Sequence, residues 1–209
     1  MVSALSIAVT LTLAVLGDSI AYGQGASSPD DTVGARLAAA LTAAGTPAQA
    51  RVFAVPGADS QGLADQVRRA TAAAPDLALI IVGANDLTHF VPPQRAAALL
   101  RDAVRALRAA GAEVVVAPAP DLSVIPWVPP QLRLAVRAGS HALQQAQTLA
   151  ARTAGAHIAD IGRSAAAFAA EPALFSPDRF HPSSAGYAVI ATALTPTVRA
   201  AVAARSTTT

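Results

Sequence analysis

The sequence predicts an α/β protein in which helices cover both faces of a parallel sheet, and three observations support this. Short apolar, β-branched runs alternate with longer segments rich in Ala, Leu, Arg and Gln. The first apolar run is hydrophobic at nearly every position, as expected of a parallel strand buried on both faces. Gly45 and Gly111 follow two of the helical segments as stop signals. This alternation predicts right-handed crossovers and a functional site at the carboxyl ends of the strands.

Each expected strand is a short apolar run that ends before a glycine or a proline. The first run, Ile7–Leu16, is continuous and stops at Gly17, so we expect it to form the first and central strand. The other four runs are shorter and follow the same rule. They are Arg51–Val55, Leu77–Val82, Glu113–Ala117 and His157–Ile161.

Five helices are expected between and after these strands, because apolar residues recur there every three or four positions among helix-favouring residues. They are Thr32–Ala44, Gln61–Ala73, Gln94–Ala110, Gln131–Ala154 and Ala185–Ala204. In the third helix, Arg101, Arg105 and Arg108 share one face, which is typical of a solvated surface.

Length and composition favour one domain over residues 1–209, with residues 206–209 as a frayed tail. The chain has 209 residues, of which 53% are hydrophobic, enough for a sizeable core. All 15 basic residues are arginine, a bias that resembles a GC-rich genome such as that of an actinobacterium. The absence of lysine excludes a Walker-type phosphate loop and a lysine Schiff base.

Charge and metal-ligating residues give no reason to expect a nucleic acid, metal or cofactor. The net charge is only +2, so a strong positive field is absent. There is no cysteine, and His89, His141 and His157 lack the spacing of a zinc motif. We expect these three histidines to be structural or surface residues; the oligomeric state is left open.

The apolar segment Val2–Leu16 invites interpretation as a signal peptide. No basic residue precedes it, and cleavage after it would remove the first strand. It is also too short to span a bilayer comfortably. We therefore expect no membrane span and a cytoplasmic location rather than export, with a trimmed upstream leader as the alternative.

Ser19 is the first candidate for chemistry. It follows the first apolar run directly and is flanked by Gly17 and Gly23, so it lies where a strand gives way to a loop. Asp, Ser and Gly are also the usual residues of a turn, which is the alternative interpretation.

A second candidate lies near the other end of the chain, where Asp178 precedes His181 by three residues. The proline-rich segment 176–184 cannot be helical throughout, so both side chains are expected on a loop. The alternative is a capped helix start, but Ser183 or Ser184 would supply that cap without them. A serine, a histidine and a carboxylate together suffice for nucleophilic catalysis, because the imidazole accepts the hydroxyl proton and the carboxylate orients the imidazole.

Two further residues follow strands and offer hydrogen-bond donors. Gly57 comes after the second expected strand, where a glycine lets a backbone N–H approach a substrate closely. Asn85 follows the third and carries a side-chain amide. Such donors suit the oxyanion of acyl transfer, although both residues are also common in turns.

Four segments together resemble the conserved blocks of the SGNH hydrolase superfamily, also called GDSL esterases and lipases, in order and spacing. They are Gly17-Asp18-Ser19-Ile20, Gly57, Gly83-Ala84-Asn85-Asp86 and Asp178-Arg179-Phe180-His181-Pro182. The resemblance implies a three-layer, flavodoxin-like fold with a five-stranded parallel sheet. Ile20 stands in place of the leucine of the founding motif, and Ala54 stands where many members have asparagine; neither change removes a catalytic atom.

The resemblance also implies roles for individual residues. Ser19 would be the nucleophile, His181 the general base and acid, and Asp178 the residue that orients His181. The backbone N–H groups of Ser19 and Gly57, with the Asn85 side chain, would form the oxyanion hole.

The substrate-binding residues are predicted from apolar side chains near this site. The segment Pro118–Pro130 includes Trp127, the sole tryptophan, and either lines an acyl pocket or packs against the body of the protein. Ile20 and Phe175 are further candidates, and Phe90 is a weaker one.

The function predicted from these residues is hydrolysis of small or acyl-chain carboxylic esters through an acyl-enzyme. Transfer of the acyl group to a sugar or another alcohol would use the same residues, and a non-catalytic carbohydrate- or lipid-binding module is a further alternative. A G-x-S-x-G elbow and a G-x-G-x-x-G fingerprint are both absent, which disfavours a classical α/β-hydrolase and a dinucleotide enzyme.

Overall fold

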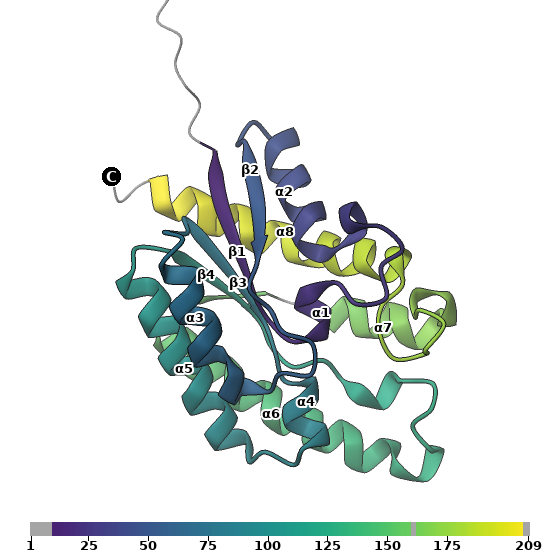
Figure 1. Ribbon diagram of the computed structural model, residues 1–209. Coiled ribbons are helices and arrows are strands. Elements are labelled where there is room, and N and C mark those ends of the chain that lie inside the picture. Colours follow the sequence, from purple (N-terminus) through teal and green to yellow (C-terminus); the bar gives the residue numbers. More distant parts are fainter. Residues whose placement is uncertain (1–9, 160–161, 207–209) are drawn as a thin grey trace, which may run out of the picture.

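The computed structural model describes residues 10–159 and 162–206 and contains one five-stranded, all-parallel sheet between two layers of helices (Figure 1). The strand order is β2-β1-β3-β4-β5. The strands are β1 (Leu11–Gly17), β2 (Ala48–Val52), β3 (Leu77–Ile81), β4 (Glu113–Ala117) and β5 (His157–Ile158). This architecture confirms the predicted three-layer α/β fold.

The long helices cover the two faces of the sheet (Figure 1). On one face lie α2 (Val33–Ala43) and α8 (Ser184–Ser206), and on the other lie α3 (Leu63–Thr71), α5 (Pro93–Ala109) and α6 (Arg133–Thr153). Three shorter helices are α1 (Ser19–Tyr22), α4 (Ala84–Thr88) and α7 (Gly162–Ala170). Single 3₁₀ turns span Pro29–Asp31, Ser60–Gly62, Leu122–Val124, Pro130–Leu132 and Pro172–Leu174.

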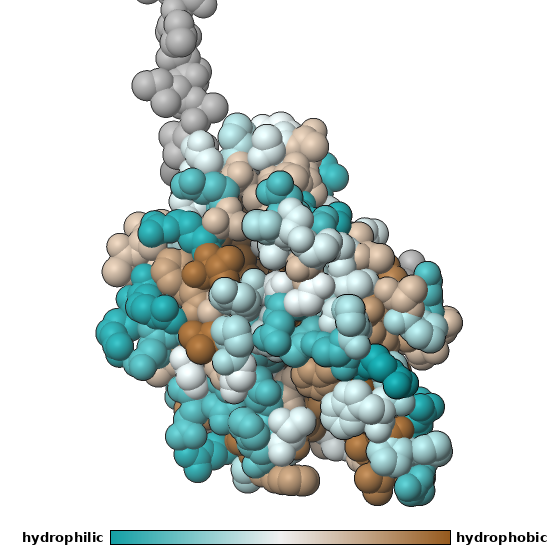
Figure 2. All heavy atoms as spheres, turned by 45° about the vertical axis from the view of Figure 1, so that its right-hand side comes forward, coloured by the Kyte–Doolittle hydropathy of each residue, from teal (hydrophilic) through white to brown (hydrophobic). Residues whose placement is uncertain are grey.

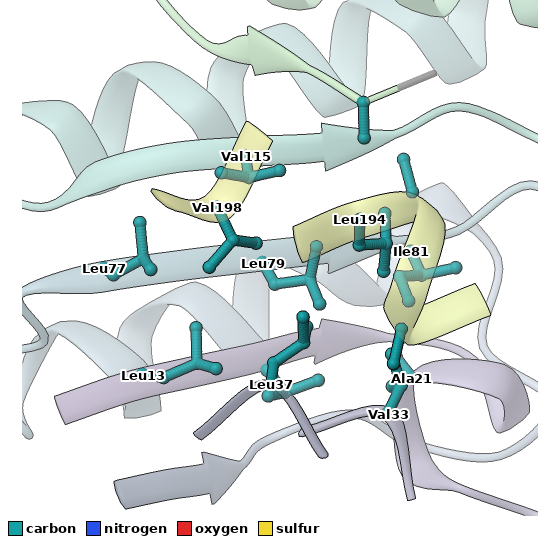
Figure 3. Packing of buried hydrophobic residues seen from close by; sticks show 14 of the residues in the cluster. Leu13, Ala21, Val33, Leu37, Leu77, Leu79, Ile81, Val115, Leu194 and Val198 are labelled. Carbon is teal, nitrogen blue, oxygen red and sulfur yellow. The ribbon is translucent and has the colours of Figure 1, made fainter. Parts of the chain in front are cut away.

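The core forms two layers because successive strand side chains point to opposite faces. Toward α2 and α8, the buried Leu13, Leu79 and Val115 pack with Leu194 and Val198 of α8 (Figure 3). Toward the other helices, the alternate strand residues are equally buried. These are Leu16, Ile80 and Val116, which pack with Val67, Leu100, Val104 and Leu107. The central strands are therefore apolar at consecutive positions, as their sequence predicted.

The sheet places its switch point beside Ser19. The connection after β1 leads to β2, which lies on one side of β1, and the next connection leads to β3, which lies on the other side. The direction of the connections therefore reverses between the neighbouring strands β1 and β3. Open α/β sheets bind ligands at such a point, outside the carboxyl ends of the strands. The Asp18 N–H donates to the Ile81 carbonyl, 3.1 Å away, and so joins the ends of these two strands.

Several predicted boundaries differ from the structure. The second strand spans Ala48–Val52 rather than Arg51–Val55, because it is a partly exposed edge strand that accepts Gln49 and Arg51 in its interior. The apolar residues after it still donate to β1, with the Phe53 N–H 2.8 Å from the Val15 carbonyl, but outside a regular ladder. The limits of an edge strand are hard to predict from hydrophobicity, because such a strand has a neighbouring strand on one side only.

The first and fifth strands are also shorter than predicted. Thr10 is not in a strand, and residues 7–9, which the prediction included, lie outside the described residues, as do 160–161. β1 lies between β2 and β3, and the middle strand of the sheet is β3, so the prediction that the first strand is the central one is wrong. The prediction that the first strand is buried is confirmed. The helices α1, α4 and α7 were not predicted.

One described helix, over Ser184–Arg205, is long and apolar enough to cross a membrane by length and composition. In the structure this part of α8 lies across the sheet, with Tyr187, Leu194 and Val198 buried. An apolar helix face that packs on a core passes the same test, so this feature carries no argument for a membrane span.

Candidate active site

The nucleophile candidate, Ser19, is the first residue of α1 and lies at the carboxyl end of β1. Asp18 caps this short helix, because its side chain accepts a hydrogen bond of 2.9 Å from the Ile20 N–H. Gly17 has a φ of +131°, and a Cβ at this position would overlap the Ile81 carbonyl. Only glycine therefore allows the chain to turn directly from the strand into the segment that carries Ser19.

The histidine and aspartate candidates lie on one tight loop. The Ser176 N–H donates to the His181 carbonyl across 2.7 Å and closes this loop. One oxygen of Asp178, Oδ1, accepts from the Ser176 hydroxyl and from the Phe180 and His181 amides at 2.8–2.9 Å. The other oxygen, Oδ2, lies 2.6 Å from His181 Nδ1. The loop thus fixes both the carboxylate and the imidazole.

The structure brings these two ends of the chain together. His181 Nε2 lies 3.0 Å from Ser19 Oγ, so hydroxyl, imidazole and carboxylate form an unbroken row of hydrogen bonds. Partial burial works against ionisation of Asp178, but its hydrogen bonds from the His181 ring, the two amides and Ser176 outweigh this and hold its pKa well below the usual range. Asp178 is therefore a carboxylate at neutral pH, as an acceptor for the imidazole must be.

A close contact between the loops keeps Ser19 and His181 at this distance. Gly25, with a φ of +92°, lies directly against the His181 loop, where an added Cβ would be 2.5 Å from the Pro182 carbonyl oxygen and 3.1 Å from His181 Cβ. Next to it, the buried Tyr187 of α8 donates its hydroxyl to the Gln24 carbonyl at 2.7 Å. Burial, together with the negative charges of Asp18 and Asp178, raises the pKa of Tyr187, so it remains a donor.

Gly57 and Asn85 both follow strands at the carboxyl ends of the sheet, after β2 and β3. Gly57 is exposed, has a φ of +80°, and has open space around it. Asn85 donates one Nδ2 hydrogen to the Ala58 carbonyl at 2.9 Å, and since an amide nitrogen carries two hydrogens, one is left for another acceptor. The structure therefore places Asn85 beside the loop of Gly57, with a donor to spare.

Two buried aspartates support this arrangement and were not singled out from the sequence. Asp86 is fully buried and accepts from both the N–H and the hydroxyl of Ser60, at 3.1 and 3.0 Å through Oδ2, which fixes the loop after Gly57. Burial raises the pKa of Asp86. Asp18 is 1% exposed, and burial, with a further contribution from the charge of Asp86, raises its pKa to about 7.

Two buried glutamines hold the strand ends and were likewise missed. Gln66 of α3 accepts from the Gly17 N–H at 2.7 Å and donates to the Gly17 carbonyl at 2.9 Å. Gln147 of α6 does the same for two other strands, accepting from the Ala119 N–H at 2.7 Å and donating to the Val82 carbonyl at 3.1 Å. Both occupy apolar-face positions of their helices, and a polar residue at such a position is the signal that would have identified them.

A cavity of about 310 Å³ opens beside Ser19, between the sheet, α7 and the segment after β4. Ile20 and Phe175 line it, as predicted from the sequence. Trp127 does not; it stacks on Phe180, which does, with ring centroids 5.8 Å apart. Phe90 is 91% exposed and takes no part in the lining.

The segment Pro118–Pro130 fulfils both interpretations offered for it. Leu122 and Ile125 line the cavity, and with Val128 they also form a buried cluster against α4 and α6. On the face in Figure 2, hydrophobic residues appear in small separate groups among hydrophilic ones.

The histidines other than His181 lie in three different settings. His157 lies 3.0 Å from Glu113, and His89 lies 3.7 Å from Asp59. His141 is exposed on the surface of α6, as predicted, and also lines the cavity. Within residues 10–159 and 162–206, no group of three or more His, Asp or Glu side chains is arranged to hold a metal ion.

A hydroxyl, an imidazole and a carboxylate in hydrogen-bonded sequence at the carboxyl edge of a parallel sheet are the arrangement of the serine hydrolases. The sequence profile of the GDSL-like lipase/acylhydrolase family matches residues 15–189, and the chain belongs to this family.

Comparison with individual proteins agrees with this assignment. A GDSL-like esterase from Mycobacterium tuberculosis is 39% identical over 184 residues, which are 86% of this chain and 59% of that protein. This chain therefore spans about three fifths of the length of that relative. Its mycobacterial source makes the predicted actinobacterial origin plausible.

Two solved structures share the fold. The crystal structure of TesA superimposes with a TM-score of 0.76 at 21% identity, covering 91% of this chain and 99% of that one. LAE5, an alpha/beta hydrolase enzyme from the metagenome of Lake Arreo, Spain, superimposes with a TM-score of 0.75 at 19% identity, covering 91% and 97%. At these identities the likeness concerns the fold alone.

Proposed function

We propose that this protein hydrolyses carboxylic esters, with Ser19 as nucleophile, His181 as general base and acid, and Asp178 as the residue that orients His181. The observation that carries the proposal is the row of hydrogen bonds from Ser19 Oγ to His181 Nε2, 3.0 Å, and from His181 Nδ1 to Asp178 Oδ2, 2.6 Å. Family membership supports the reaction type.

The first half of the reaction forms an acyl-enzyme. His181 Nε2 accepts the proton of Ser19 as Oγ attacks the ester carbonyl carbon, and the ionised Asp178 stabilises the imidazolium. The tetrahedral intermediate then collapses, and His181 returns the proton to the departing alcohol. In the second half, water takes the place of the alcohol: His181 removes its proton, the acid leaves, and Ser19 is regenerated.

The oxyanion is stabilised by the N–H groups of Ser19 and Gly57 and by the free Nδ2 hydrogen of Asn85. Within the described residues, neither backbone N–H donates to another protein group. Asp86 and the Ala58 carbonyl hold these donors in place through Ser60 and Asn85. Donors that are already oriented stabilise charge without reorganisation when the reaction occurs, which is the largest single contribution in many enzymes.

The test is hydrolysis of p-nitrophenyl esters from acetyl to palmitoyl by the wild type and by Ser19→Ala. Turnover that depends on Ser19 is expected, and the chain length with the highest kcat/KM is the first information on the substrate. Turnover that persists in Ser19→Ala, in a protein that folds normally by circular dichroism, would assign the reaction to another nucleophile. Product analysis with added alcohols separates hydrolysis, which gives a free acid, from acyl transfer, which gives a new ester.

A further inference from the structure

The cavity beside Ser19 has one wall that differs from the rest. Near the nucleophile it is apolar, lined by Ile20, Phe175 and Phe180. On the side formed by α6 and α7 it presents three polar side chains, His141, Gln144 and Ser164. A ligand that fills this cavity therefore meets apolar surface close to its ester and polar groups further away.

Among the described residues, none of these polar side chains has a hydrogen-bond partner. Ser164 is 6% exposed, and its hydroxyl is the one buried side-chain polar atom, among the described residues, that lacks a hydrogen bond. His141 and Gln144 also form no side-chain hydrogen bond with any described residue. A buried hydroxyl left unpaired costs about 1–3 kcal/mol, so native proteins rarely keep one without a ligand or a water to pair it.

The acyl group, rather than the alcohol, is the part of the substrate that fits this cavity. The departing alcohol and the incoming water must both reach His181 Nε2, so the alcohol side has to open to solvent. The acyl group stays attached to Ser19 through both halves of the reaction and can occupy an enclosed space. Neither Ser19 nor His181 is among the lining residues, but their neighbours Ile20, Phe180 and Pro182 are, so the cavity begins next to the nucleophile.

The charge around the cavity selects among polar groups. No arginine lines it, and the one carboxylate in its wall, that of Asp121, is already paired with Arg137, whose Nε lies 3.5 Å from Oδ2. An anionic group on the ligand would therefore find no free counterion among the lining residues. A hydroxyl is neutral and both donates and accepts, as do the side chains of serine, glutamine and neutral histidine.

From this arrangement we propose that the substrate of this protein is an ester of a hydroxylated acyl chain, whose hydroxyl binds Ser164 and Gln144 at the polar wall of the cavity. The inference rests on the proposed esterase function and specifies its substrate class.

The experiment compares matched pairs of substrates. The kcat/KM values of the p-nitrophenyl esters of hexanoic, octanoic and decanoic acids are each compared with those of their ω-hydroxy counterparts. Three chain lengths are used in order to find the one that brings the hydroxyl to Ser164. For at least one pair, the wild type is expected to show a kcat/KM about fivefold higher for the hydroxylated ester, which corresponds to one net hydrogen bond. Half-esters of the matching dicarboxylic acids are expected to be poorer than both.

Variants then locate the preference. Ser164→Ala is expected to reduce the ratio of the two kcat/KM values toward one, and Gln144→Leu to reduce it as well. Gln145→Leu is the matched control, because Gln145 is the exposed neighbour on the same helix, does not line the cavity, and should leave the ratio unchanged.

The outcomes separate this inference from the proposed function. If the wild type hydrolyses plain esters through Ser19 but prefers no hydroxylated ester at any length, the inference is overturned and the esterase function stands. An unchanged ratio in Gln144→Leu and Ser164→Ala would also overturn it. If no ester is hydrolysed, the proposed function fails; calorimetric titration of the Ser19→Ala variant with each acid and its ω-hydroxy form then tests the cavity alone, and equal affinities would overturn the inference.

Discussion

Asp18 and Asp178 carry the same carboxyl group at the same site, but the pKa values of the two groups are shifted in opposite directions. Asp18 is buried at the end of β1, beside a second buried carboxyl group, and its pKa is raised to about 7. Asp178 lies on a partly exposed loop with four donors around it, and its pKa is lowered. The difference lies in the balance between burial and hydrogen bonding: at Asp18 burial outweighs the backbone donors of Ile20, Gly83 and Ala84, whereas at the partly exposed Asp178 the donors together outweigh the weaker burial.

The two aspartates also link stability to pH with opposite signs. Because the pKa of Asp18 is higher in the folded state, its contribution to stability is present at low pH and is lost as the pH rises toward about 7. Because the pKa of Asp178 is lower in the folded state, its contribution is present at neutral pH and is lost on acidification through the folded pKa.

The largest expected effect comes from removing the charged member of this pair. Asp178→Ala should lower kcat by about 10³- to 10⁴-fold, since the imidazole loses the acceptor that fixes its tautomer and stabilises its charged form. Steady-state hydrolysis of an ester identified as a substrate measures this. A loss below tenfold in a folded protein would remove Asp178 from the mechanism.

The second largest loss of activity is expected when the His181 loop is moved away from the segment that carries Ser19. Gly25→Ala would place a Cβ against Pro182 and His181 and so move the imidazole from Ser19. A displacement near 1 Å should lower kcat by about 10²-fold.

The control for this change is Gly45→Ala. Gly45 has a φ of +90°, close to that of Gly25, but nothing lies within 4 Å of its Cβ position. Both variants should therefore carry similar backbone strain, and only Gly25→Ala should lose activity. Equal activity in the two variants would show that the contact with the His181 loop has no catalytic role.

A smaller effect is expected at the buried end of β1, where Gln66 holds the Gly17 peptide. Gln66→Leu keeps a similar volume but leaves the Gly17 N–H unpaired in the core, while the Gly17 carbonyl keeps only the Val55 N–H as a donor. The unpaired N–H should cost about 1–3 kcal/mol of unfolding free energy. Urea denaturation measures it. Gln61→Leu, at an exposed position, should change stability little, and a loss as large as that of Gln66→Leu would contradict the role of Gln66.

The last prediction concerns the member of the pair whose pKa is raised. Relative to wild type, Asp18→Asn should become progressively more stable between about pH 4 and pH 7, by up to about 1.4 kcal/mol per pH unit, because asparagine has no proton to lose. Thermal unfolding of both proteins across this range measures the difference. A difference that does not depend on pH would show that Asp18 titrates as in the unfolded chain.

Sequence reasoning succeeded where side-chain pattern and local chemistry coincide. β3 and β4 are apolar at consecutive positions, so their limits were predicted within one residue. Ser19, Asp178 and His181 were predicted as a group because together they suffice for nucleophilic catalysis and match the SGNH blocks, and the structure places them in contact.

It failed where the deciding partner lies far along the chain. The limits of β2 depend on its position at the sheet edge. The roles of Gln66 and Gln147 depend on the strand ends to which they are hydrogen-bonded. Asp18 and Asp86 are 68 positions apart in sequence, and their mutual repulsion follows from the pairing of β1 with β3. The polar wall of the cavity depends on the packing of α6 and α7 around it.

The measurement that tests the central claim most directly is active-site labelling with a fluorophosphonate, followed by mass spectrometry of the digested protein. The account predicts a single adduct on Ser19 that forms in step with loss of ester hydrolysis, forms much more slowly in Asp178→Ala, and is absent in Ser19→Ala. An adduct on another residue, or full inactivation with Ser19 unmodified, would contradict it.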